Sequence, residues 1–388
     1  RESFIKAIDQ HANHLMRCFF LDLSGFPYLE ALKGQLYCAL FIERFHKKRE
    51  KILLRLCNEI NQQLLPDGGH QSRSGDVLLS LLSLCLEVKK TLEQLKIECP
   101  ADLNIAIDRI APMIRTLRHT DGTMARFHGS MENDPDWIDH LLEMSGNMGK
   151  PLSNARHCGY QRIDAHKTVL LVDVGSPPSL PYNQTPHAAP LSFELSVDDE
   201  RLLVNCGSIL ETDRNWQQAL SQTQAHNTLC VDGRSCYDFD NDAKLVMKET
   251  TLEAERLEEN GHVLIETSHD AYKEAFGLIH HRSLYLNKTG DDLRIEDKLI
   301  GQGGQSFEIS LHLHPNVHAS IDYEGQAVLL KTQKQSGWYL RLQGAKVDLR
   351  ESIYMDDRKG PVPTDQIVIF GPLRGEGCVV KWSLRKIT

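Results

Sequence analysis

The stretch HAAPLSFELSVDDERLLVNCG, residues 187–207, contains two short strand patterns joined by a polar turn. In LSFELSV, apolar and polar residues alternate, which is the period of a half-buried β-strand. The acidic turn DDE follows, and RLLVNCG is a second apolar run that ends at a glycine. His187 stands just before the first strand, where it either points off the sheet edge into a cleft or is a loop histidine without a role. The stretch therefore predicts an antiparallel strand pair with a histidine at one end.

The strand pattern extends over the C-terminal part of the chain. The short runs with this texture are TVLLVDVG, NTLCVDG, GHVLIETSHD, SLYLNKTGDDLRIEDKLI, FEISLHLHP, AVLLKTQ, WYLRLQG, QIVIFG and CVVKWSLRK. Turn signals such as Thr-Gly-Asp-Asp and Glu-Gly-Gln separate them. Many short strands at regular spacing predict an antiparallel β-sandwich, which we expect from about residue 165 to the end of the chain.

Residues 1 to about 145 have helical periodicity instead. A long run from Gln35–Leu65 carries apolar residues at helical spacing and stops at PDGG. The next helix, capped by Ser74 or Asp76, is apolar almost all round in its first turns, which is typical of a buried helix. The segment ADLNIAIDRIAPMIRTLRH follows, and Pro112 inside it predicts a kink. Paired helices with Gly-rich connections favour an α/α arrangement, either a solenoid or a closed toroid.

These two patterns predict an α+β chain of two domains. The segment EMSGNMGKPLSN, in which both patterns break off, is the expected linker. We place a helical domain at residues 1–148 and an antiparallel β-sandwich domain at residues 149–388. Because ligands of two-domain proteins commonly bind where the domains meet, we expect one cleft between them.

Composition and charge exclude several functional classes. With 41% apolar and 25% charged residues, the 388-residue chain has ample material for a core. Its net charge of −9 argues against nucleic-acid binding, but an acidic protein still accommodates a local basic cleft for an anionic sugar. No apolar run approaches the length of a membrane span, and no signal peptide is visible, although the chain opens at Arg1. Ten cysteines without a Cys-x-x-Cys pair favour a reducing compartment.

Several polar clusters lie where predicted helices or strands end. Arginine and asparagine neutralise a carboxylate, and histidine moves a proton near neutral pH, so such clusters suit an anionic sugar. Each residue taken singly is more often a satisfied loop residue, but loops beside a domain cleft are enriched in site residues. The clusters contain His70, Arg73, Arg126 and His128 in the helical half, and His187, Arg214, His226, Asn227 and the segment HHRS at 280–283 in the β half.

Other chemistries have weaker support. The sequence has no G-x-S-x-G elbow, Walker A loop, dinucleotide fingerprint or H-E-x-x-H motif. His312 and His314 share one face of a predicted strand, which suits a metal ion. Packing under a sheet is the more frequent reason for such a pair.

With these residues in hand, the chain resembles the heparinase II/III family of polysaccharide lyases. The segments HAAPLSFELS–RLLVNCG, AHNTLCVDG and HRSLYLNKTGDDLRIEDKLIG–FEISLHLHP are similar to C-terminal motifs of that family. PDGGHQSRS and HTDGTMARFHG are similar to toroid motifs of its bacterial members. The resemblance covers most of the chain from Pro66 onward and implies an α/α-toroid followed by an antiparallel β-sandwich. We expect the chain to begin partway into the toroid.

The resemblance also implies β-elimination at a uronic acid. A neutralising group quenches the carboxylate, a base removes the C5 proton, and an acid protonates the leaving glycosidic oxygen. The family's histidine before the LSFEL-like strand carries over to His187. The family's toroid tyrosine falls at Val77, which cannot move a proton, and its candidate replacements are Arg73, His70 and Tyr182.

Two further family features are incomplete in this sequence. The family's neutralising group is an Asn or His on an earlier helix, for which Asn13-His14 is the candidate. Some members hold a structural metal through a histidine, an aspartate and a second histidine, and those positions read Ala189, Asn205 and His226. Only His226 is a strong ligand, so we expect no zinc there and no other cofactor.

Two functional hypotheses follow. The first is a lyase that cleaves a uronate-containing acidic polysaccharide in the cleft, and the second is a non-catalytic carbohydrate-binding or envelope-associated protein on the same scaffold. Catalysis is assigned to His187, His70 and Arg73, with His70 and Arg73 expected to face His187 across the domain boundary. The expected partner is an acidic polysaccharide or oligosaccharide, and the expected location is the cell envelope or periplasm, with the cytoplasm as the alternative. Substrate binding is assigned to Asn227, His226, Arg214, Arg126, His128 and Tyr182.

Overall fold

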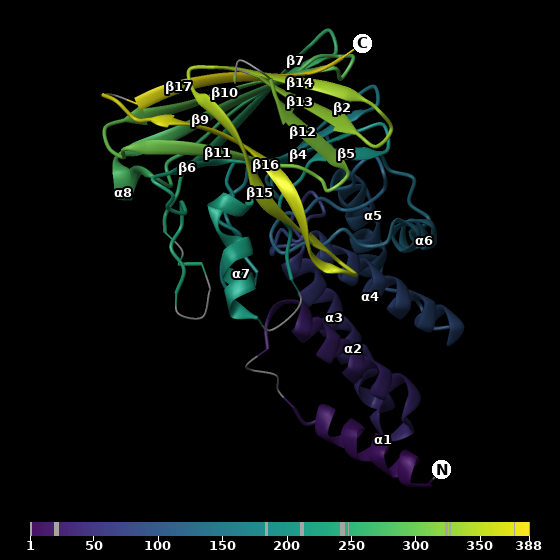
Figure 1. Cartoon of the computed structure of the whole chain (residues 1–388). Coiled ribbons are helices and arrows are strands. Elements are labelled where there is room, and N and C mark those ends of the chain that lie inside the picture. Colours follow the sequence, from purple (N-terminus) through teal and green to yellow (C-terminus); the bar gives the residue numbers. More distant parts are fainter. Residues whose placement is uncertain are drawn as a thin grey trace.

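The computed structural model describes residues 2–18, 23–182, 185–209, 213–240, 245–246, 248–322, 325, 327–375 and 377–387. Its N-terminal part consists of helices, with α1 at the end farthest from the strands (Figure 1). These elements are α1 (Glu2–Leu15), α2 (Gly25–Phe41), the 3-10 helix η1 (Glu43–Lys48), α3 (Arg49–Gln63), α4 (Gly75–Gln94), α5 (Ala101–Thr116) and α6 (Pro135–Ser145).

The apolar faces of α2 to α6 form one core. Helix α4 is buried on almost every side, as its sequence predicts, through leucines at 78, 79, 81, 82, 84 and 86. The run predicted from Gln35–Leu65 is interrupted at Ile42, whose backbone is extended (φ −116°, ψ 110°). The following segment, η1, has no fully buried residue, and its contact with the helical core is through the partly buried Phe45. Pro112 lies inside α5, where Thr116 Oγ1 donates a hydrogen bond to its carbonyl oxygen.

The strands begin at Asn154 and form open antiparallel sheets. A five-stranded sheet has the order β1 (Asn154–Ala155), β2 (Tyr160–Ala165), β3 (Thr168–Asp173), β4 (Phe193–Val197), β5 (Glu200–Leu203). An eight-stranded sheet has the order β12 (Val317–Ile321), β13 (Ala327–Thr332), β14 (Gly337–Gln343), β17 (Gly377–Lys386), β10 (Asp292–Gly301), β9 (Leu278–Leu286), β8 (His262–His269), β7 (Leu252–Glu259). A four-stranded sheet has the order β15 (Lys346–Asp356), β16 (Gly360–Pro372), β11 (Ser306–His312), β6 (Leu229–Val231). The short helices α7 (Arg214–Ser221), η2 (Thr223–Ala225) and α8 (Lys273–Phe276) lie between strands.

Alternating side chains build the core of the sandwich. Strand β9 buries every second residue, and its Leu284 joins Ile295 of β10 in the interior. The same cluster contains Ile309 from the four-stranded sheet and Leu170 and Leu195 from the five-stranded sheet. The eight-stranded sheet therefore covers both smaller sheets. This arrangement confirms the predicted antiparallel β-sandwich after a helical half.

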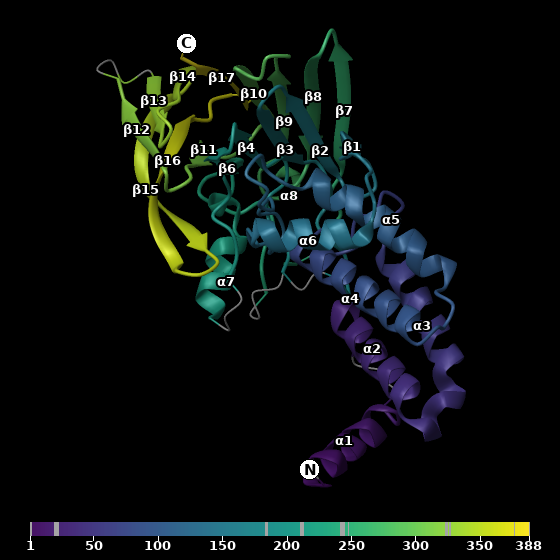
Figure 2. The same cartoon turned by 90° about the vertical axis from the view of Figure 1, so that its right-hand side faces the viewer.

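The five-stranded sheet belongs to both cores. In β3, Leu170 faces the sandwich, whereas its neighbours Val169 and Leu171 pack against the helices. All six residues of β3 are buried, because each face of the strand is covered. The sheet joins the helices to the sandwich (Figure 2), so residues at the ends of its strands lie at the junction. Within the described residues, no helix has the length and apolar character needed to cross a membrane.

Candidate functional site

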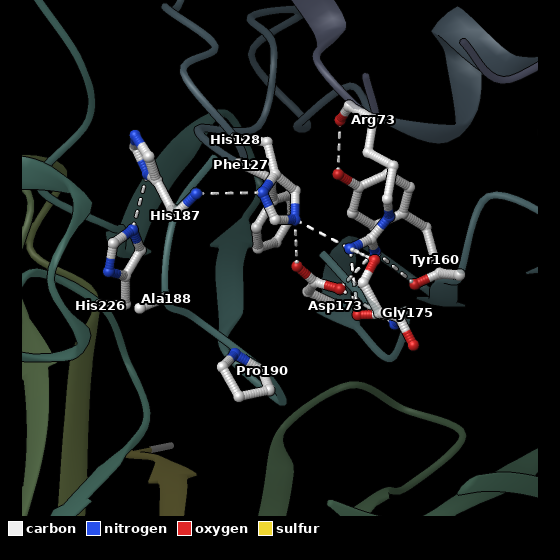
Figure 3. Close-up of polar contacts among 12 residues, drawn as sticks. Arg73, Phe127, His128, Tyr160, Asp173, Gly175, His187, Ala188, Pro190 and His226 are labelled. Atoms are coloured by element: carbon white, nitrogen blue, oxygen red, sulfur yellow. Dashed lines mark hydrogen bonds and ion pairs between the residues drawn. The ribbon is translucent and has the colours of Figure 1, made fainter. Parts of the chain in front are cut away.

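A row of polar side chains crosses the junction between the helices and the five-stranded sheet (Figure 3). Arg73 precedes α4, His128 lies in the loop between α5 and α6, and Asp173 ends β3. His187 precedes β4, and His226 follows η2. Each of these residues is at most 6% exposed. Segments that are distant in the sequence thus meet in one buried polar cluster.

Arg73 is the anchor on the helical side. It forms a buried ion pair with Asp173. Burial tends to lower the pKa of Arg73, but the charge of Asp173 outweighs it, so the guanidinium stays charged. The remaining donors reach carbonyl oxygens at 2.7–3.1 Å, those of Cys158, Gly159, Gly175 and Ser176. Because protein acceptors occupy its donors, Arg73 braces the junction.

His128 connects the Arg73–Asp173 pair to His187. Its Nδ1 lies 3.3 Å from the backbone nitrogen of His187, and its Nε2 lies 2.9 Å from Asp173 Oδ2. The backbone N–H donates, so the lone pair is on Nδ1 and the proton on Nε2 is donated to Asp173. Arg73 Nη1 approaches the same Nε2 at 2.8 Å, a contact between two donors that the shared Asp173 carboxylate offsets. Burial and the charge of Arg73 lower the pKa of His128, so the ring is neutral.

His187 and His226 form a hydrogen-bonded pair that fixes which nitrogen of His187 is free. His226 Nδ1 lies 2.8 Å from the carbonyl oxygen of Gln222 and therefore carries the proton. His226 Nε2 accepts from His187 Nδ1 at 2.8 Å. The lone pair of His187 is then on Nε2, at the end of the ring turned away from the other residues in Figure 3. Burial, with His226 and His128 nearby, lowers the pKa of His187 well below its usual value, so it is a neutral base.

The loop that carries His187 is held through its backbone carbonyl groups. Thr223 Oγ1 donates to Ala188 at 2.7 Å, and Thr228 Oγ1 donates to Pro190 at 2.8 Å. Arg282, from the HHRS segment, donates to the carbonyl oxygens of Leu191 and Asn227 at 2.8 Å. Its charge is balanced by Asp297 at 2.7 Å, whose pKa the guanidinium lowers against the effect of burial. This network fixes the position of His187 relative to the sheet.

His128 stands between His187 and Arg73, and His70 belongs to a separate set of contacts. The Nδ1 of His70 accepts from the backbone nitrogen of Ser72 at 2.9 Å, and its Nε2 donates to Gln63 Oε1 at 2.9 Å. Its ring packs edge-on against Tyr182, with ring centroids 5.8 Å apart. Burial lowers the pKa of His70 to about 4 and raises the pKa of Tyr182.

The other residues that the sequence analysis singled out for the site lie in different parts of the structure. Asn227 is fully buried and structural, because its side chain donates to Phe193 and accepts from the backbone nitrogen of His312. Arg214 is the first residue of α7 and is exposed. Val77 lies in the first turn of α4. Asn13-His14 lies near the end of α1, and Asn13 donates to Asp9 within that helix.

Arg126 is the other buried cation of the loop that carries His128, at 1% exposure. Its Nη2 donates to the carbonyl oxygen of Met355, and its guanidinium lies 4.0 Å above the ring of Tyr354. Gly207, with φ 96°, lets the backbone approach this guanidinium, and a Cβ there would collide with it. Within the described residues, Arg126 Nε and Nη1 have no hydrogen-bond partner. Two donors of this buried cation therefore have no acceptor among the described residues.

The residues at the implied metal positions do not fit a metal ion. Ala189 has no ligand atom, and His226 Nε2 already accepts from His187. Asn205 accepts through Oδ1 from the backbone nitrogen of Asn227 at 3.0 Å, which leaves a donor, Nδ2, in place of a ligand. In the part of the chain that the structure describes, no group of three or more His, Cys, Asp or Glu side chains is arranged to hold a metal ion.

Sequence reasoning missed two residues of this cluster. Asp173 pairs with both Arg73 and His128, and Tyr160 donates from its hydroxyl to the carbonyl oxygen of Arg73 at 2.6 Å. A signal for Asp173 was present, since a carboxylate directly after the apolar run TVLLV lies at a strand end. Tyr160 follows a glycine at the start of a strand and carried no comparable signal.

Comparison with known proteins gives a consistent picture. The family model described as "Heparinase II/III-like, C-terminal" matches residues 147–383. FtsZ-localized protein C of Caulobacter vibrioides is 30% identical over 356 residues, which are 86% of this chain and 61% of that protein. The chain therefore spans about three fifths of the length of that relative.

Solved structures show the same fold. The crystal structure of heparinase III has a TM-score of 0.79 at 14% identity, and the match covers 99% of this chain and 64% of that one. Heparan sulfate lyase HepC from Pedobacter heparinus has a TM-score of 0.75 at 13% identity, over 99% and 63% of the two chains. At these identities the likeness concerns the fold alone, and it confirms the predicted toroid-like helical part followed by a sandwich.

Proposed function

Because the chain belongs to the heparinase II/III-like family, we propose that it cleaves a uronate-containing polysaccharide by β-elimination at the junction of the helices and the sandwich. The family supplies the polysaccharide-lyase scaffold. The observation that carries the proposal is the fixed tautomer of His187, whose Nδ1 is committed to His226. A neutral imidazole with a free Nε2 accepts a proton from a sugar carbon without first losing one of its own.

Three groups share the reaction in this proposal. His187 Nε2 takes the C5 proton of the uronate. The unpartnered donors of Arg126, counted among the described residues, hold the carboxylate and the enolate-like charge that develops on it. Tyr182, in the loop that leads to His187, donates the proton to the leaving glycosidic oxygen, because burial raises its pKa and keeps its hydroxyl protonated.

The experiment is an absorbance assay for unsaturated uronate products over a panel of acidic polysaccharides. Wild-type protein should release such products from at least one member, and Tyr182→Phe should lower the rate while leaving the fold intact. Release of saturated sugars, or of no product from the whole panel, would contradict the lyase assignment.

A non-catalytic role on the same scaffold is the second candidate, and four observations favour it. His187 is only 2% exposed, and the guanidinium of Arg73 donates its hydrogen bonds to acceptors within the protein. Val77 replaces the tyrosine expected from the family resemblance. The Caulobacter relative is named for its localisation with FtsZ and not for a reaction. Binding of an acidic oligosaccharide without product release would select this role.

We also propose a place in the bacterial cell envelope or periplasm, by analogy with proteins that handle extracellular polysaccharides. The cytoplasm is the alternative, and all ten cysteines are free thiols, as a reducing compartment favours. Fractionation of cells that express the full-length protein separates the two locations.

A further inference from the structure

The outer face of the eight-stranded sheet carries a hollow of about 480 Å³. Strands β9, β10, β17 and β14 form this part of the sheet, on the side of the molecule turned away from the helices (Figure 1). The hollow is therefore remote from His187. Its volume lies in the range of small-ligand sites.

Positive charge gathers in this hollow although the chain as a whole is acidic. Its lining contains one carboxylate, Glu296, and four cations, Arg294, Arg341, Lys381 and Arg385. Asp292 is shared by Arg294 at 2.6 Å and Arg385 at 3.0 Å, and Glu296 pairs with Lys381 at 2.7 Å. Four cations thus face two carboxylates in a chain whose net charge is −9. A local excess of positive charge attracts an anion.

Strand register places these side chains in two rows across the sheet. Tyr285, Arg294, Ser383 and Arg341 are successive cross-strand partners on β9, β10, β17 and β14. Ser283, Glu296, Lys381 and Gln343 form the neighbouring row on the same strands. Each strand contributes one outward-facing residue to a row. Each row therefore places cationic side chains beside side chains that carry hydroxyl or amide groups.

Aromatic rings hold two of the arginines in place. The Arg294 guanidinium lies 5.5 Å from the Tyr285 ring centroid, and that ring stacks against His262 at 5.8 Å. The Arg341 guanidinium lies 4.9 Å from the Tyr339 ring. Among the described residues, no ion pair engages Arg341, so its planar fork is available to a carboxylate or sulfate group.

From these features we propose that the hollow is a second binding site for an acidic saccharide. Guanidinium groups take the carboxylate or sulfate groups, and Ser283, Ser383 and Gln343 take the sugar hydroxyls. This mixture of cations with hydroxyl and amide groups fits a chain of acidic sugars better than a headgroup that offers only a phosphate. The inference rests on the proposed function in one respect, since the ligand is the same class of polysaccharide. In this proposal the hollow holds one part of the polysaccharide while another part of the same polysaccharide lies at the junction.

The test is calorimetric titration of the full chain with tetragalacturonate and with a heparin-derived tetrasaccharide. Arg341→Ala should weaken binding at the hollow about tenfold, the loss of one charge-assisted contact. Glu296→Gln should tighten binding, because it releases Lys381 from the one carboxylate with which it forms an ion pair among the described residues. Lys90→Ala removes the same charge from an exposed position near the end of α4 and should change nothing.

Stoichiometry separates this inference from the proposed function. If both hold, two oligosaccharides bind, and Arg341→Ala weakens one of the two binding events about tenfold. If only the hollow binds, one oligosaccharide binds, and Arg341→Ala weakens that single event about tenfold. Unchanged affinity and stoichiometry in both Arg341→Ala and Glu296→Gln would overturn the inference. Binding of vesicles that contain acidic phospholipid through Arg341, with neither tetrasaccharide bound, would also overturn it.

Discussion

At the scale of single residues, the buried charges at the junction are stabilised by an ion pair and by the hydrogen bonds around it. The Arg73–Asp173 pair is almost fully buried, and burying two charges is favourable only when the geometry is good and other hydrogen bonds complete it. Here His128 and several carbonyl groups complete it. Sequence reasoning placed Arg73 at the substrate because the pairing with a strand end 100 residues away has no local signal.

Replacing Arg73 with methionine should therefore destabilise the fold more than it weakens sugar binding. The change leaves Asp173 charged and buried without its cation, which typically costs about 3–5 kcal/mol. Urea unfolding measures this cost, with Arg156→Met on the exposed surface as the matched control. If the variant were as stable as wild type but bound the sugar more weakly, Arg73 would have to be a substrate-binding residue.

In the proposed reaction, His226 acts through His187 as a positioning residue. His226→Ala removes the acceptor of His187 Nδ1–H, so the ring is free to rotate and exchange tautomers. We expect kcat to fall, on the order of tenfold to a hundredfold, with little change in KM and a shifted pH profile. His226→Gln keeps an acceptor and should restore part of the rate. Equal kcat and pH profiles for the alanine variant and wild type would show that the pair is only structural.

The replaced metal positions lead to a separate expectation. Ala189, Asn205 and His226 supply a single strong ligand, and that ligand is occupied by His187. Purified protein should contain well under one zinc ion per chain by elemental analysis. One zinc per chain, lost in His226→Ala, would show that the ring pair rearranges to bind metal.

At the scale of elements, the sequence predicted most of the strands and the buried character of α4. A strong alternation of apolar and polar residues made β4, β9 and β10 recognisable in the sequence. Strand β7 was missed because its sequence LEAERLEE is mostly charged, and it pairs only at the sheet edge with β8. The break at Ile42 was missed because the apolar period continues through η1, where the structure leaves every residue at least partly exposed.

Helix α4 begins beside a carboxylate whose ionisation opposes folding. Burial, aided by the charge of Asp357 and opposed by bonds from Met131 and Asn133, raises the pKa of Asp76 to about 6. The folded state thus holds the proton more tightly than the unfolded chain, so stability falls as pH rises from about 4 to about 6. Asp76→Asn keeps the Oδ1 acceptor without the charge.

We therefore expect Asp76→Asn to melt at the wild-type temperature near pH 4 and a few degrees higher near pH 7.5. Thermal unfolding followed by circular dichroism at both pH values measures the difference. A lower melting temperature for the variant at pH 7.5 would show that the charged form is the stabilising one.

At the scale of the whole molecule, the two halves are joined in two places. The five-stranded sheet shares a core with each half. The hairpin of β15 and β16 extends beyond the sandwich (Figure 2), where Asp357 accepts from the backbone nitrogens of Glu132 and Asn133. Arg201 pairs with Glu132 and Asp121 nearby. Two attachments fix the relative position of the halves, which a site divided between them requires.

The lyase scaffold was predictable from motifs, whereas the contacts inside the junction were not. HAAPLSFELS marked both the strand and the histidine that precedes it. The hydrogen bonds among His128, His187 and His226 depend on loops whose folded paths leave no periodic signal. Residue types could therefore be assigned to the junction, but not their partners.

The most direct test of the account is the rate at which His187→Ala forms unsaturated uronate product, compared with wild type and with His281→Ala. His281 lies on the outer face of β9, so its loss should leave the rate unchanged. We expect His187→Ala to lose on the order of 10²–10⁴ of the rate, the usual contribution of a general base, in a variant that is less stable but still folded at the assay temperature. A folded His187→Ala variant that forms product at the wild-type rate would contradict the central claim.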